Sequence, residues 1–520
     1  MTVKNSGTTL KTQYVYDADD RETQTQAKSK TLTTAYDALG RLDTKTWNTG
    51  TPFVTKYHYM AGANGSQSSQ VASVDIGSQK IMYTYDGNGN ITSITDSQGT
   101  TTYACDELNR LVREDNHQLC KTVTYLYDAA ENIQKKCTYA LTTAQNLPAL
   151  PEAASVYAYD DVWRDKLVSV DGKAITYDAI GNPLTYGAWS MEWTQGKRLA
   201  SMNSGDGGNT LMFTYDESGM RLSKLDFAGS KNHKYTIAGD KLTGERCENM
   251  DGSVLYTTQF VYDSAGEAVS MVYNGVEYYF VRNGQRDVTG LIDGNGNIVV
   301  HYTYDSWGQL LKVEGNTELG YRNPLRYRGY IADDETGLYY VGSRYYDPVV
   351  GRWISADDVE TLTDNSLDNK NLYAYCDNNP VCREDIEGNF WGALALAGGG
   401  TAAVASMGTI GGSIFAALSV VVPVVAVVVI AVAVATVAVH YKMSKGGKQN
   451  YRDTELQNKD ENEISEKSHD RNLRGKDKQR VVRQDKVNRK RNVQKRENQI
   501  HNCGKKKKVK KVKKEKKRYE

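Results

Sequence analysis

The sequence predicts a mainly β protein made of stacked antiparallel hairpins, and three observations support this fold class. A short motif that begins with Tyr-Asp recurs along residues 11–310. The segments before it alternate in polarity, as in IMYTYD (81–86), which places one set of side chains on one face of a strand. The composition includes 36 Tyr and 46 Gly but only 8 Pro, and Tyr and Gly favour strands joined by tight turns. We therefore expect residues 11–388 to contain almost no helix.

Each copy of the motif reads Tyr-Asp, two variable residues, Gly, a polar residue and an aliphatic residue. Asp bonds its own backbone in a turn, and Gly supplies the positive φ that such a turn requires. The aliphatic residue then opens the return strand, so that each unit is a strand, a turn and a strand. A lone hairpin is marginal in water, so the units must stack into a continuous spiral sheet. The clearest copies begin at Tyr36, Tyr85, Tyr177, Tyr215 and Tyr304.

One hairpin can be predicted in full. Asn274-Gly275 separates two alternating runs, and Asn-Gly in this setting is the strongest short hairpin signal. A two-residue loop fixes which residues face each other, and the facing residues make one apolar and aromatic surface. The predicted pairs are Tyr273 with Val276, Met271 with Tyr278, and Val269 with Phe280.

The densest part of the chain follows the repeats. It contains GYIADDETGLYYVGSRYYDPVVGRWISADD (329–358) and NLYAYCDNNPV (371–381). Together with the Tyr-Asp repeats, these motifs resemble the Rhs/YD-repeat proteins and their repeat-associated core. The resemblance divides the chain into a YD-repeat region, residues 1–278, and a core, residues 279–390.

The resemblance implies a hollow β-shell wound from YD hairpins, which encloses a variable C-terminal toxin and is closed at one end by the core. The repeat array is short and begins mid-repeat, so we interpret the chain as a partial member with an incomplete shell. It would act as a delivery protein in bacterial competition or secretion, secreted or at the cell surface. The expected partners are an immunity protein and a secretion apparatus. The N-terminus lacks the apolar segment of an ordinary secretory signal.

The resemblance also implies a candidate catalytic site. Some members of the family release their toxin by aspartyl self-cleavage at the end of the core, and the matching positions here are Arg344, Asp357 and Asp385. Two adjacent carboxylates share a proton, so one can activate water while the other donates a proton. Cleavage would fall after Asn389, although Ile386 and Asn389 replace the Pro and Leu of the family's motif. The alternative is that both carboxylates only bond turn amides.

Residues 391–440 form an uncharged segment rich in Gly, Ala and Val. Its second half, residues 414–439, is almost entirely aliphatic, and a helix of this length exceeds the roughly 30 Å hydrocarbon core of a membrane. Lys442 follows as a positive flank. Two interpretations remain open: a transmembrane helix that anchors a surface repeat protein, or an apolar linker enclosed by the shell.

The last segment, residues 441–520, carries 29 Lys and Arg against 12 Asp and Glu. It has no wide apolar face, so we expect a helical or disordered basic tail. A Lys/Arg run over residues 471–520 suits non-specific contact with nucleic acid phosphates, without the interleaved aromatics that stack on bases. The tail is therefore either a solvated extension or a nucleic-acid-targeting toxin.

Conventional catalytic motifs do not stand in a convincing context anywhere in the sequence. The seven cysteines are scattered and form no Cys-x-x-Cys pair, so we expect no metal site and no small-molecule cofactor. Whether the chain is an enzyme therefore depends on the self-cleavage site and on the basic tail.

Overall fold

A computed structural model describes residues 2–5, 8–62, 66–205, 207–357, 371–385, 388 and 391–393. All of them belong to one compact unit, Met1–Ser419. Within these ranges no helix has the length and apolarity needed to cross a membrane. The predicted helix 414–439 and the predicted tail 441–520 lie outside the described residues.

Two large antiparallel sheets make up most of the unit, and in both every strand pairs with its neighbours in sequence. The first sheet contains β3 (Gln13–Tyr16), β4 (Glu22–Gln26), β5 (Thr31–Tyr36), β6 (Leu42–Trp47), β7 (Phe53–Ala61), β8 (Gln67–Ile76), β9 (Gln79–Tyr85), β10 (Ile91–Thr95), β11 (Thr100–Cys105), β12 (Leu111–Asn116), β13 (Lys121–Tyr127), β14 (Ile133–Ala140), β15 (Ala153–Tyr159), β16 (Leu167–Val170) and β17 (Lys173–Ala174). The second contains β18 (Thr176–Tyr177), β19 (Pro183–Tyr186), β20 (Trp189–Thr194), β21 (Arg198–Ser204), β22 (Thr210–Tyr215), β23 (Arg221–Asp226), β24 (Lys231–Ala238), β25 (Lys241–Asn249), β26 (Val254–Tyr262), β27 (Ala268–Tyr273), β28 (Val276–Arg282), β29 (Val288–Ile292), β30 (Ile298–Tyr304) and β31 (Leu310–Gly315).

This arrangement confirms the predicted fold class. Up to residue 388, the described helices are α1 (Thr317–Arg322) and short 3₁₀ turns such as Tyr327–Gly329 and Cys376–Asn378. The predicted hairpin is β27–β28. Its register pairs Tyr273 with Val276 and Met271 with Tyr278, as the Asn-Gly loop requires.

The aspartate of each repeat builds its turn. Asp86 shows the geometry: its Oδ1 accepts hydrogen bonds from the amides of Asn88 (2.9 Å) and Asn90 (2.8 Å), and its Oδ2 accepts one from Asn90 Nδ2 (2.9 Å). Gly89 adopts a φ of 86°, which L side chains rarely adopt. The carboxylate and the glycine together close the turn.

In most repeats the tyrosine joins its unit to an earlier one. The Tyr127 hydroxyl donates to the carbonyl of Leu111 at 2.6 Å, and Leu111 opens the return strand of the preceding unit. A phenylalanine would fill the same space without this bond, which accounts for the preference for tyrosine. Equivalent bonds join Tyr36 to Glu22, Tyr85 to Val71, Tyr159 to Ile133, Tyr215 to Leu199, and Tyr304 to Val288.

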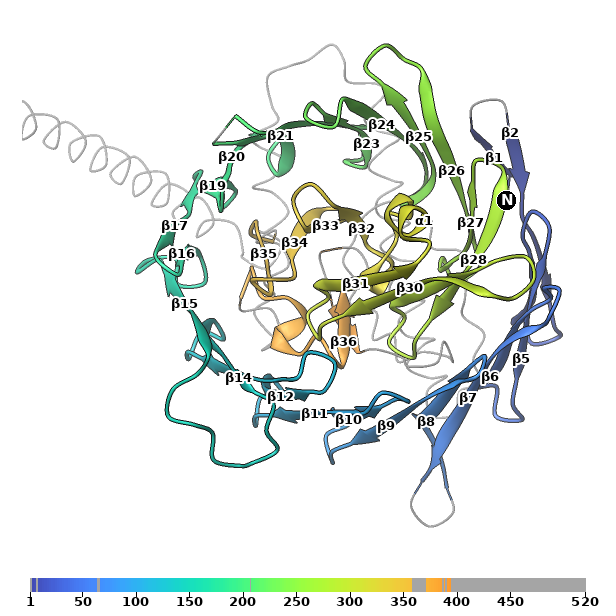
Figure 1. Cartoon of the computed structure of the whole chain (residues 1–520), viewed down its shortest axis with the longest axis horizontal. Helices are drawn as coiled ribbons and strands as arrows, with labels where there is room; N and C mark the ends of the chain where they lie inside the picture. Colours follow the sequence, from blue (N-terminus) through green and yellow to red (C-terminus); the bar gives the residue numbers. More distant parts are fainter. Residues whose placement is uncertain are drawn as a thin grey trace, which may run out of the picture. The chain divides into compact units, whose positions relative to one another are not determined.

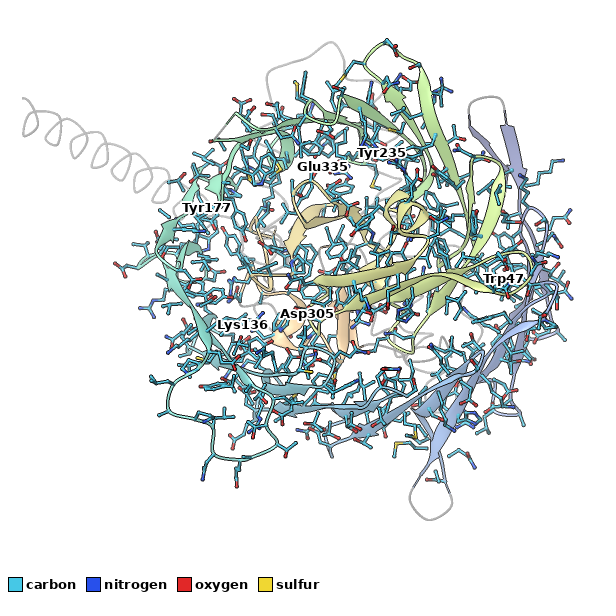
Figure 2. The ribbon with its side chains drawn as sticks, in the orientation of Figure 1. Trp47, Lys136, Tyr177, Tyr235, Asp305 and Glu335 are labelled. Atoms are coloured by element: carbon cyan, nitrogen blue, oxygen red, sulfur yellow. The ribbon has the colours of Figure 1, made fainter. Side chains whose placement is uncertain are left out.

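The strands of this unit follow one another around a ring, and the first strands meet the late ones (Figure 1). At this seam the Glu277 carboxylate accepts hydrogen bonds from the amides of Lys28 (2.9 Å) and Ser29 (2.8 Å). Trp47 packs on Tyr279 with ring centroids 4.3 Å apart, and Figure 2 shows Trp47 beside the late strands. The seam therefore joins residues about 250 positions apart without a strand ladder between the described strands. Backbone bonds add to its side-chain contacts, since the amide of Gly50 donates to the carbonyl of Gly294 at 3.0 Å.

A smaller sheet lies inside the ring (Figure 1). It consists of β32 (Ile331–Asp333), β33 (Leu338–Val341), β34 (Arg344–Asp347) and β35 (Arg352–Trp353), and a two-stranded pair, β36 (Arg383–Asp385) with β37 (Trp391–Ala393), follows it. Both large sheets hold this core. The guanidinium of Arg221 pairs with Asp333 at 2.6 Å, and Asn371 Nδ2 donates to Asn132 Oδ1 at 2.8 Å.

We predict that Tyr127→Phe destabilises the protein by about 1 kcal/mol, because it removes a partly buried hydrogen bond without opening a cavity. The shift in the urea unfolding midpoint measures this loss. Tyr16→Phe is the matched control, because Tyr16 also precedes a repeat aspartate but is 48% exposed. Equal midpoint shifts in the two variants would contradict the role assigned to the hydroxyl.

A second prediction concerns Asp305, which lies inside the ring near Lys136 (Figure 2). Burial raises the pKa of its carboxyl to about 6. Because the folded state favours the protonated acid, Asp305 lowers stability as pH rises from about 4 to about 6, and the cost then stays constant. Asp305→Asn keeps the turn acceptor and removes the charge. We expect a gain that grows over this pH window and reaches at most ~3 kcal/mol above it.

Calorimetric melting of the parent and variant at several pH values checks this difference. Asp293→Asn is the matched control, because Asp293 builds the same turn. At Asp293 burial raises the pKa less than the hydrogen bonds from Asn297 and Asn295 lower it, and the pKa lies below its usual value. The control should show no such gain, and an equal gain in both variants would contradict the role of burial.

Candidate functional site

The structure brings the three predicted site residues together from separate segments. Arg344 opens β34, Asp357 lies four residues after β35, and Asp385 ends β36. Arg344 Nη2 lies 2.9 Å from Asp357 Oδ2 and 3.5 Å from Asp385 Oδ2. One guanidinium nitrogen therefore bridges both carboxylates.

All three side chains are buried. Arg344 is 5% exposed, Asp357 10% and Asp385 3%. Arg344 also donates from Nη1 to the carbonyl of Leu372 at 3.1 Å, and its guanidinium lies 4.3 Å from the centre of the Trp353 ring. One cation therefore faces two carboxylates in a setting with little solvent. Such a pair can act as acid and base in one reaction.

The family's terminal motif corresponds here to residues 380–389, and its Gly388 contacts this cluster directly. The carbonyl of Gly388 accepts hydrogen bonds from Arg344 Nε and from Ser343 Oγ, the latter at 3.1 Å. Its amide donates to Asp385 Oδ1 at 2.8 Å. The Tyr330 hydroxyl donates to the carbonyl of Asp385 at 2.5 Å. Residues 386, 387, 389 and 390 lie outside the described residues.

A cavity of about 820 Å³ adjoins the cluster. Ser343 and Asp357 line it from the core, and turns of the second sheet line it from the opposite side, with Lys197 and Lys241 among them. Lys197 Nζ donates to the carbonyl of Ala356 at 3.0 Å, which ties this rim of the shell to the residue before Asp357. Asp357 therefore lies at the wall of this cavity.

Sequence reasoning missed several of these groups. Ser343 could have been found from the sequence, because it directly precedes Arg344 in a motif that the resemblance had already identified. The carbonyl of Leu372, the hydroxyl of Tyr330 and the amine of Lys197 carried none, because backbone groups and common side chains show no pattern in a single sequence. Among the described residues no group of three or more His, Cys, Asp and Glu side chains is arranged to hold a metal ion.

The sequence pattern of the Teneurin YD-shell family matches residues 100–381. This chain belongs to the Teneurin YD-shell family. The match spans more than half of the chain and covers both repeat strands and the inner sheet, which confirms the resemblance to YD-repeat shells. The family membership agrees with the two large antiparallel sheets.

Individual relatives are longer proteins. The chain is 31% identical over 293 residues to the tRNA3(Ser)-specific nuclease WapA of Bacillus spizizenii. The aligned region covers 56% of this chain and 12% of that protein. It is 25% identical over 373 residues to toxin subunit YenC1 of Yersinia entomophaga, covering 60% of this chain and 37% of the subunit. The chain thus spans only a minor part of either relative.

Solved structures share the fold. The structure of TcdB2-TccC3 without its hypervariable C-terminal region matches with a TM-score of 0.55 and 18% identity, over 74% of this chain and 22% of that chain. The Photorhabdus luminescens Tc holotoxin pore matches with a TM-score of 0.55 and 19% identity, over 75% of this chain and 22% of that chain. At these identities the likeness is one of fold.

Proposed function

We propose that the chain is the shell and core of a delivery protein, which encloses and presents its own C-terminal segment as an effector in bacterial competition or secretion. The observation that carries this proposal is where the core's final strands lie. Asn378 donates to the carbonyl of Glu131 in the first sheet at 2.8 Å, and Arg286 of the second sheet pairs with Glu384 at 2.8 Å. Figure 1 shows β36 inside the ring, so the chain leaves the core from a segment that both sheets surround.

Two of the relatives are a tRNA nuclease and a toxin subunit, which supports a toxin context. An immunity protein and a secretion apparatus follow as proposed partners, with a secreted or surface location. The basic run 471–520 supports a nucleic-acid target for the effector, and the apolar run 414–439 supports either passage into a membrane or a place inside the shell. The proposed roles of these two runs are argued from their amino-acid sequence.

Enclosure predicts protection of the basic tail. Trypsin cuts after Lys and Arg, which are dense in residues 441–520. We expect native full-length protein, pretreated with nuclease, to keep this tail intact while the same tail fused to an unrelated carrier is cut at once. Mass spectrometry of the time courses measures both. If the tail is lost equally fast in the two proteins while residues 11–388 stay intact, the proposal that the shell encloses the tail is wrong.

We further propose that Arg344, Asp357 and Asp385 release the effector by cleaving the chain after Asn389. Water attacks the carbonyl carbon of Asn389, the ionised carboxylate takes its proton, and the protonated partner gives a proton to the leaving nitrogen of Phe390. One water is consumed, and a new carboxylate and a new amine result. Arg344 holds the charge of the ionised partner throughout.

The expected result is a fragment that begins at Phe390 in the parent and is absent in Asp357→Asn, since an amide cannot take the proton from water. Mass spectrometry of the purified chains identifies the fragment. Asp20→Asn, at an exposed turn, is the control and should cleave like the parent. An intact parent, or equal cleavage in all three, would leave the two buried carboxylates with a structural role alone.

A further inference from the structure

Gly388 is held at both its carbonyl and its amide by residues of the cluster. Its carbonyl receives two donors, Ser343 Oγ and Arg344 Nε, and its amide donates to Asp385 Oδ1. Three bonds on one residue leave little freedom in its position. A backbone carbonyl has two lone pairs, and here both are used by side-chain donors from the cluster.

Only glycine fits this position. Its φ is 78°, in the left-handed region, and a Cβ placed on it would lie 2.4 Å from the carbonyl oxygen of Val341 and 2.9 Å from Ser343 Oγ. The backbone of Val341 belongs to β33 and cannot give way as a flexible side chain would. The absence of a side chain therefore lets the backbone of Gly388 lie close to the turn between β33 and β34.

The same guanidinium fixes the motif and the carboxylates. Arg344 uses Nε for the carbonyl of Gly388 and Nη2 for Asp357 and Asp385. Because the guanidinium group is planar and rigid, the distance between that carbonyl and the carboxylate pair is set by one group. Consecutive Cα atoms lie about 3.8 Å apart, so the proposed scissile bond begins one residue beyond the fixed point.

We propose that Ser343 and Gly388 form a positioning clamp that sets the register of the terminal motif over the carboxylate pair. The clamp rests on the proposed self-cleavage after Asn389 and assigns it two further residues. Neither residue exchanges a proton or forms a covalent bond in the reaction. Ser343 holds the carbonyl through its hydroxyl, and Gly388 provides the close approach that brings the carbonyl within reach.

The test follows cleavage as the full chain is made in a cell-free translation system, with labelled protein sampled over time. Ser343→Ala removes one donor and should slow cleavage roughly tenfold, the effect of one hydrogen bond on a rate. Ser343→Thr keeps the hydroxyl and should restore most of the parent rate. Gly388→Ala should abolish cleavage, because the added carbon displaces the motif.

The matched control is Ser355→Ala. Ser355 is fully buried two residues before Asp357, and its hydroxyl has no hydrogen-bond partner among the described residues. This variant should cleave at the parent rate. Melting temperatures of all serine variants should agree closely, which separates loss of register from loss of fold. Cleavage of Ser343→Ala at the parent rate, or no rescue by threonine, overturns the clamp.

If the parent chain stays intact, self-cleavage is wrong. Amide hydrogen exchange measured on the same intact chain then tests the clamp separately from cleavage. A clamped Gly388 amide exchanges slowly in the parent and rapidly in Ser343→Ala and Asp385→Ala. Slow exchange that these variants abolish supports a fixed register with no reaction attached. Fast exchange in the parent shows that the motif is not held and overturns the clamp as well.

Discussion

The structure depends on the bond from a repeat tyrosine to the carbonyl of an earlier strand. It adds a side-chain contact between neighbouring units to the ladder bonds and to the apolar packing of the sheet. In the best repeats the arginine of one turn adds a second contact. Arg110 pairs with its own Asp106 at 2.6 Å and lies 4.6 Å from the ring centre of the next unit's Tyr127. Turn, arginine and tyrosine thus form one connected set.

The contacts among turn, arginine and tyrosine recur along the sheet and hold one of its faces in place. The core packs against that face. Tyr125, next to a repeat tyrosine along β13, presents its hydroxyl to Trp307 Nε1 at 2.8 Å. Arg221 and Lys224 hold Asp333 in a nearly dry setting, where burial opposes the charge but both cations outweigh it and lower the pKa of Asp333 to about 2. A buried ion pair is costly to break, so these contacts favour one placement of the core.

That placement creates the candidate site. β34 begins with Arg344, and the large sheets hold the segments that supply Asp357 and Asp385. Lys197, on the shell, bonds the carbonyl of Ala356, so the shell also positions one of the carboxylates. Shell and core together therefore bring the two acids and their cation into contact, which suits the proposed cleavage, because the site exists only once the chain has folded.

Much of this could be predicted from the sequence, because the decisive signals are local. Strand, turn and return strand lie within about ten residues, and Asp86 with Gly89 closes its turn by contacts over four residues. The register of β27 and β28 follows from two loop residues, Asn274 and Gly275. The three site residues were predicted from the motif of a resembling family. Such a motif identifies the residues but does not show how far apart their side chains lie.

The tertiary structure alone decided the rest. The seam between Glu277 and Ser29, the bridge from Arg344 to two carboxylates, and the donors on Gly388 join groups that are about 13 to 250 positions apart. No periodicity links such positions, because their meeting depends on how the strands curve and where the core packs. The sequence therefore determined the repeating unit and its family, and the folded chain determined which side chains face one another inside it.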